Sequence, residues 1–63
     1  MGYRELEQCR DFEKLKTVFD DDMLNYFGKQ LEEYMNGSEE RPTIVCWWEG
    51  MMSTEELINQ NSL

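Results

Sequence analysis

The sequence predicts a small α+β domain that consists of two amphipathic helices, one central strand and a short C-terminal helix. Apolar residues recur at helical spacing over residues 4–19 and 21–36, and a β-branched, aromatic run follows at 43–49. A capping sequence then precedes the last apolar residues. A chain of 63 residues is expected to form a single small acidic domain over 1–63. Such a domain buries only about 60% of the surface that its unfolded chain exposes.

Residues 4–19 are predicted to form the first helix. Their apolar residues recur at spacings of three and four and so share one face: Cys9, Phe12, Leu15 and Phe19. An alternative exists for the end of this segment. Residues 14–19 alternate and are β-branched enough to form an edge strand, which would make the fold βαβα. Helix is the preferred interpretation.

Residues 21–36 are predicted to form the second helix, because their apolar residues follow the pattern of one buried face. These residues are Met23, Leu24, Phe27, Leu31, Tyr34 and Met35. An aspartate of the run Asp20–Asp22 is expected to cap the start, and the others favour the positive end of the helix dipole. Asn36-Gly37 supplies the left-handed residue that ends many helices. Gly28 lies near the buried face, where it allows close packing.

Residues 43–49 are predicted to form the central strand. Pro42 is tolerated at the start of a strand, and both faces of the run are largely apolar. On a strand, Trp47 and Trp48 point in opposite directions, so one can fill the core while the other meets a partner. A single strand cannot satisfy its own backbone groups. It is therefore expected to pair across a homodimer or with an edge of the target, unless residues 14–19 form a strand of the same chain.

The last element is predicted to be a short helix with clear start chemistry. Ser53-Thr54-Glu55-Glu56 fits a capping box, with Ser53 as the cap and Glu56 three positions later. Met52 and Leu57 are placed for the hydrophobic staple that accompanies such a start.

The net charge of −8 is unevenly distributed along the chain. Charges cancel over residues 1–19, whereas ten of the 14 acidic residues lie from Asp20 onward against only Lys29 and Arg41. This balance disfavours direct nucleic-acid binding through phosphates and favours a partner with a basic surface. The competing interpretation is that the charge only keeps the protein soluble.

Catalytic groups are poorly represented. The chain has no histidine, no glycine-rich phosphate loop and no zinc-ligand spacing, so we expect neither an enzyme nor a bound cofactor or metal. Asp20–Asp22 are expected to cap a helix and not to bind a cation, since adjacent side chains diverge. Cys9 and Cys46 are expected to be free thiols, although one disulfide between them stays open. Without an export pattern or a membrane-length apolar run, the cytoplasm is the expected compartment.

The sequence therefore predicts a non-enzymatic protein that inhibits or modulates a larger, basic, nucleic-acid-handling protein by stoichiometric binding. Nucleic-acid mimicry is one way to do so, and phage or mobile-element proteins that antagonise a host enzyme or defence system share these bulk properties. The alternative is a structural or regulatory subunit that docks through its Trp-containing strand. The residues expected to bind the partner are Asp20, Asp21, Asp22, Tyr26, Glu32, Glu33, Glu39, Glu40, Trp47, Trp48 and Glu49.

Overall fold

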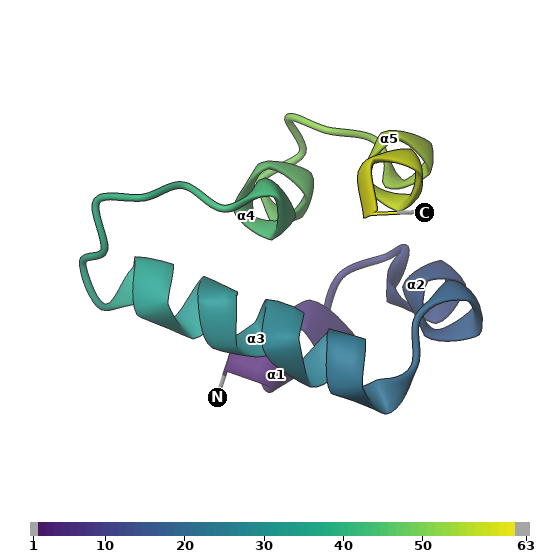
Figure 1. Ribbon diagram of the computed structural model, residues 1–63, viewed down its shortest axis with the longest axis horizontal. Helices are drawn as coiled ribbons and strands as arrows, with labels where there is room; N and C mark the ends of the chain where they lie inside the picture. Colours follow the sequence, from purple (N-terminus) through teal and green to yellow (C-terminus); the bar gives the residue numbers. More distant parts are fainter. Residues whose placement is uncertain (1, 62–63) are drawn as a thin grey trace.

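The computed structural model describes residues 2–61. This part of the chain contains five helices, joined by turns and loops (Figure 1). The helices are α1 (Gly2–Glu7), α2 (Phe12–Val18), α3 (Asp21–Met35), α4 (Thr43–Trp48) and α5 (Thr54–Asn61). The longest helix, α3, runs across the molecule and contacts α1, α2 and α4. Helix α5 packs on α2 and α4, so the second half of the chain folds back over the first.

The α+β prediction is wrong, because the segment predicted as the central strand forms helix α4. No strand occurs within residues 2–61. Pro42 is extended, with φ −61° and ψ 157°, and immediately precedes the first turn. Gly50 adopts φ 83°, which allows the Met51 amide to donate to the Cys46 carbonyl at 2.8 Å and closes a Schellman-type end. These two breaker positions, together with burial of the helix, override the strand propensity of the run between them.

The predicted single helix over residues 4–19 is divided into α1 and α2. A turn joins them, in which the Cys9 amide donates to the Leu6 carbonyl at 3.0 Å and the Phe12 amide to the Cys9 carbonyl at 3.2 Å. Apolar residues spaced strictly by three drift around a continuous helix. The break brings both Leu6 (0% exposed) and Phe12 (5% exposed) into the core.

The βαβα alternative is also wrong. Helix α2 includes residues 14–18 and ends at Val18, so the preference for helix in this segment is confirmed.

The two helices that the sequence places with capping signals are confirmed. Asp20 Oδ1 accepts a hydrogen bond from the Met23 amide at 2.9 Å and caps α3. At the other end of α3, Gly37 adopts φ 104°, and the Ser38 amide donates to the Glu33 carbonyl at 3.1 Å. Ser53 likewise caps α5, because its Oγ accepts from the Glu56 amide at 3.1 Å.

All five helices contribute side chains to one core. Its buried apolar residues are Leu6, Phe12, Leu15, Leu24, Phe27, Leu31, Ile44, Val45, Trp47 and Leu57. Helix α1 approaches α3 at Gly28, where a Cβ atom would lie 2.8 Å from the Tyr3 backbone nitrogen. The close packing predicted at this glycine is therefore confirmed. Helix α1 can lie this close to α3 because glycine has no Cβ atom.

Candidate functional site

The acidic residues at the start of α3 are exposed, but one of them also has a structural role. Asp20 is the helix cap, whereas Asp21 and Asp22 occupy the first turn. Carboxylates in the first turn interact favourably with the helix dipole. Asp21 and Asp22 do not cap the helix, so their exposed carboxylates are accessible from solvent.

A second acidic group lies at the other end of α3 and in the loop that follows. Glu33 is exposed and Glu32 is half-buried near the helix end, and the loop carries Glu39 and Glu40, both exposed. The two groups are separated along the axis of α3 by the eleven residue steps from Asp22 to Glu33. At 1.5 Å per residue this separation is about 16 Å. The structure therefore places the predicted acids in two groups at opposite ends of one helix.

The predicted residue Glu49 follows α4 and forms an ion pair. It accepts a hydrogen bond from Arg41, whose guanidinium also contacts the Met51 sulfur at 2.9 Å. These contacts connect the loop before α4 to the turn after it. Glu49 therefore contributes to the conformation of this region, and its negative charge is largely compensated.

Tyr26 lies on α3 between the two acidic groups and is 54% exposed. Its hydroxyl oxygen accepts a hydrogen bond from Gln30 Nε2 at 3.1 Å. The ring also lies beside Phe27, with 6.1 Å between ring centroids. Tyr26 is thus an exposed aromatic side chain that contacts two neighbours on the same helix.

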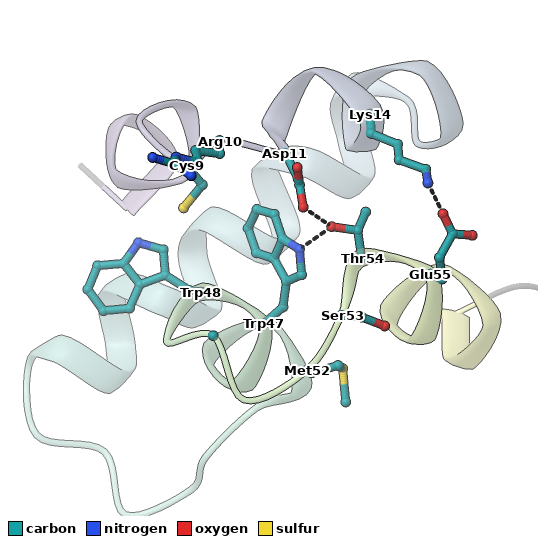
Figure 2. A pocket seen from close by; sticks show the side chains of 11 residues that line it. Cys9, Arg10, Asp11, Lys14, Trp47, Trp48, Met52, Ser53, Thr54 and Glu55 are labelled. Atoms are coloured by element: carbon teal, nitrogen blue, oxygen red, sulfur yellow. Dashed lines mark hydrogen bonds and ion pairs between the residues drawn. The ribbon is translucent and has the colours of Figure 1, made fainter.

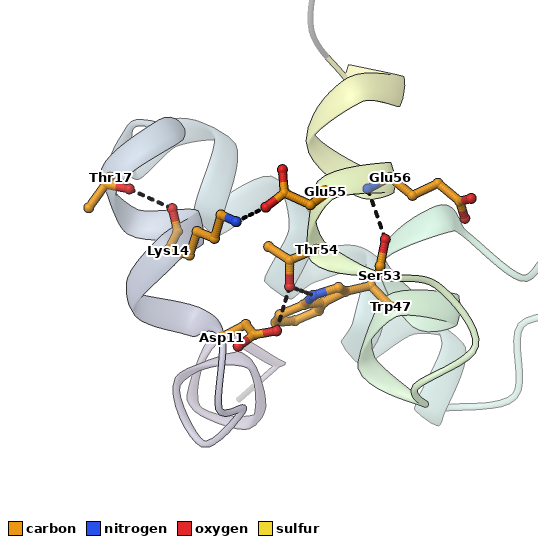
Figure 3. Close-up of polar contacts among 8 residues, drawn as sticks. All are labelled: Asp11, Lys14, Thr17, Trp47, Ser53, Thr54, Glu55 and Glu56. Carbon is orange, nitrogen blue, oxygen red and sulfur yellow. Dashed lines mark hydrogen bonds and ion pairs between the residues drawn. The ribbon is translucent and has the colours of Figure 1, made fainter.

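The two tryptophans have different environments. Trp47 is 7% exposed, and its indole Nε1 donates to Thr54 Oγ1 at 2.9 Å. Thr54 in turn donates to Asp11 Oδ2 at 2.6 Å, across 43 positions of sequence (Figure 3). Trp48 is half-buried. Trp47 therefore belongs to the core, and Trp48 is the tryptophan that reaches the surface.

A hollow of about 540 Å³ lies where the α1–α2 turn faces the segment that joins α4 to α5 (Figure 2). Trp48, Met52 and the hydrogen-bonded series of Trp47, Thr54 and Asp11 line it. This hollow could not be predicted from the sequence, because residues far apart in the chain form its walls. The sequence patterns identified parts of its lining separately, as the Trp47-Trp48 pair and as the capping box around Thr54, but did not bring them together.

The charged side chains of the hollow compensate each other. Lys14 forms an ion pair with Glu55, and Arg10 lies on the same wall as Asp11. Because the lining holds two cations and two carboxylates, the hollow has little net charge. Its polar groups serve mainly to connect α2 with α5, and they give it no clear preference for an anion or a cation.

Cys9 also lines the hollow, and both Cys9 and Cys46 are free thiols, as predicted. Burial raises the pKa of the Cys9 thiol above its ordinary value, and the negative charges of Glu5 and Asp11 raise it further. The thiolate is the nucleophilic form of cysteine. Cys9 is therefore a protonated, weakly reactive thiol at neutral pH.

Two properties of residues 2–61 bear on the type of site. No set of three or more histidine, cysteine, aspartate or glutamate residues in this range is arranged to hold a metal ion. None of the helices in the same range combines the length and hydropathy needed to cross a bilayer.

Comparison with known proteins assigns no family to the chain. The sequence matches no protein-family model, and no curated protein or solved structure is significantly similar to it.

Proposed function

We propose that this protein is a non-enzymatic binding protein that inhibits or modulates a larger, basic protein by stoichiometric binding. The observation that carries the proposal is the exposure of its acidic residues from Asp20 onward. The exposed acids are Asp20, Asp21, Asp22, Glu33, Glu39, Glu40, Glu49, Glu55 and Glu56, of which Glu49 and Glu55 form ion pairs with Arg41 and Lys14. Only Lys29 and Arg41 oppose them in this part of the chain, and Arg41 is already paired with Glu49. A basic surface would be attracted to this field.

Nucleic-acid-handling proteins are the partner class that fits best. Their basic grooves bind phosphates, and exposed carboxylates can occupy the same positions. This makes nucleic-acid mimicry the favoured mode of inhibition, as in phage or mobile-element antagonists of a host enzyme or defence system. Two free cysteines suit a reducing compartment, so we place the interaction in the cytoplasm.

The fold removes the argument for a homodimer paired through a strand. The dimer was expected because a lone strand leaves backbone groups unsatisfied, but residues 43–49 are helical and the Glu49 amide donates to the Val45 carbonyl at 2.9 Å. The reason to pair strands across a homodimer has therefore gone.

The alternative, a structural subunit that docks through its Trp-containing segment, has less support. Ile44, Val45 and Trp47 are buried inside this chain and offer no surface to another protein. Trp48 is the one tryptophan of the segment with a substantial exposed portion. We therefore favour the charged surface over the apolar segment as the basis of binding.

Competition with DNA or RNA for basic nucleic-acid-binding proteins tests the proposal. We expect the protein to displace nucleic acid from at least one of them and to lose affinity steeply as salt rises. Displacement that is insensitive to salt, or no displacement from any protein of the panel, would refute the charge-based mode.

A pair of matched variants adds a control within the chain. Glu39→Gln/Glu40→Gln removes two exposed carboxylates from the acidic part, whereas Glu7→Gln/Glu13→Gln removes two from the electrically balanced part. The first variant should weaken binding several-fold, and the second should have a much smaller effect. Equal effects would mean that only total charge matters, and not its position.

A further inference from the structure

Helix α3 has an outer face that the rest of the described chain leaves uncovered. Leu24, Phe27, Gly28 and Leu31 form its buried side. Opposite them, exposed residues recur at spacings of four, three and four: Asp22, Tyr26, Lys29 and Glu33. This spacing places them in one stripe along the helix, about 16 Å long at 1.5 Å per residue.

Tyr26 occupies the middle of this stripe and is well suited to anchor a partner. The hydrogen bond from Gln30 and the neighbouring Phe27 ring favour this orientation of the side chain, which lowers the entropy cost of binding. Tyrosine also combines an apolar ring with a polar tip and is enriched among the residues that dominate interface energies.

Four carboxylates against one lysine on α3 favour a cationic partner, and that lysine, Lys29, lies in the stripe three positions after Tyr26. Asp22 and Glu33 lie at the two ends of the stripe, and Asp21 and Glu32 lie next to them in sequence, whereas Lys29 is the single cation of the helix. Arginine matches this arrangement better than lysine. Its planar guanidinium stacks on aromatic rings and binds carboxylates through two parallel hydrogen bonds.

We infer that the outer face of α3 is the docking surface for an arginine-rich protein segment, with one arginine stacked on Tyr26 and others paired with Asp22 and Glu33. This inference rests on the proposed function and names the surface and the residue type that it recognises. The hollow beside Trp48 is a weaker candidate, because Arg10 and Lys14 offset Asp11 and Glu55 there.

The test uses the full-length protein and two synthetic peptides of equal length and charge, one rich in arginine and one in which lysine replaces each arginine. Nuclear magnetic resonance with the isotope-labelled protein maps the contact surface. We expect the largest shifts along residues 22–33, and tighter binding of the arginine peptide than of the lysine peptide.

Variants at Tyr26 examine the anchor directly. Tyr26→Ala should weaken binding of the arginine peptide by about three- to tenfold and reduce its advantage over the lysine peptide, whereas Tyr26→Phe should retain both. Val18→Ala is the matched control, because Val18 is 48% exposed on α2, outside the stripe. It should leave binding unchanged, and circular dichroism verifies that each variant is folded.

The outcomes separate the surface from the function. Three results would overturn this surface but leave the proposed function standing, provided that binding is salt-sensitive. They are equal affinity for both peptides, no effect of Tyr26→Ala, and largest shifts around the hollow or residues 39–40. Absence of salt-sensitive binding to either peptide would overturn this surface, whereas the proposed function falls only if the competition with nucleic acid also fails.

Discussion

Helices α3 and α4 are determined in different ways. Helix α3 has 15 residues, a side-chain cap at Asp20 and a glycine end at Gly37. Helix α4 has six residues and follows Pro42, which makes no side-chain capping bond. So short a helix is not stable in isolation. Its stability must come from burial of Ile44, Val45 and Trp47 in the core.

This difference matters for function, because the proposed docking surface lies on the helix with the stronger local signals. The outer face of α3 depends on the helix itself and on residues such as Tyr26 and Gln30, which are one turn apart. The hollow depends on contacts between α2, α4 and α5. Substitutions in the core should therefore unfold α4 and disrupt the hollow more completely than they unfold α3.

The largest expected effect comes from Trp47→Ala, which removes the main side chain that holds α4. Truncation of a buried tryptophan costs about 3–5 kcal/mol. A domain of this size has a total stability of about 3–9 kcal/mol. The variant should be largely unfolded or marginally stable, as measured by urea denaturation with circular dichroism. A loss below about 1 kcal/mol would show that α4 does not depend on this contact.

Trp48→Ala is the internal comparison for that measurement. Trp48 is half-buried and makes no hydrogen bond comparable to the one between Trp47 and Thr54 within the described residues. Its loss should therefore be clearly smaller. Equal losses of unfolding free energy would mean that neither the hydrogen bonds through Thr54 nor the deeper burial of Trp47 adds measurable stability.

The contrast also explains how much of the fold could be predicted from the sequence. Signals that act within a few residues predict the helix ends correctly, as with Asp20, Asn36-Gly37 and Ser53. Helix α4 was not, because β-branched and aromatic residues suit a strand until tertiary contacts decide otherwise. The proline before the run and Gly50 after it form the asymmetry that often brackets a helix, and they were the available signal.

Some features of the candidate site could likewise be predicted from local sequence, and others depend on tertiary contacts. Acidic residues and the exposed position of Tyr26 follow from charge counts and helical spacing, so the sequence indicated them. Burial of Trp47 and the hydrogen bond between Asp11 and Thr54 could not be predicted, since these residues come from separate helices. The break between α1 and α2 was missed for a related reason: it serves the packing of Leu6 and Phe12.

Gly28→Ala should destabilise the protein although alanine favours helices. On helix propensity alone, the substitution in α3 would stabilise by about 1 kcal/mol. The new Cβ would lie 2.8 Å from the nitrogen and 2.9 Å from the Cα of Tyr3, both backbone atoms that cannot rotate away. Overpacking of this kind costs about 1–3 kcal/mol, so we expect a net loss in thermal or urea unfolding.

A peptide that spans α3 alone is the control for Gly28→Ala. The same substitution should raise its helix content, because α1 is absent. A net gain of stability in the whole protein would contradict the close contact between α1 and α3.

Gly37→Ala and Gly50→Ala compare the ends of α3 and α4 directly. The two glycines adopt φ 104° and 83°, and a Cβ would meet no atom within 4 Å at either position. The cost is therefore confined to the backbone and should be about 1–2 kcal/mol at each. Hydrogen exchange should accelerate at the Ser38 amide in the first variant and at the Met51 amide in the second. Unchanged exchange would mean that these glycine ends are not needed.

The smallest effects are expected at the two helix starts. Asp20→Ala removes the side-chain cap of α3 and should cost about 1 kcal/mol, while Asp20→Asn should restore most of it because asparagine caps equally well. Pro42→Ala removes no such bond, and it should cost about 0.5 kcal/mol by freeing the unfolded chain. Urea denaturation of the three variants measures both terms. If Asp20→Ala costs no more than Pro42→Ala, the start of α3 is not fixed by its own cap, and α3 depends on tertiary contacts as α4 does.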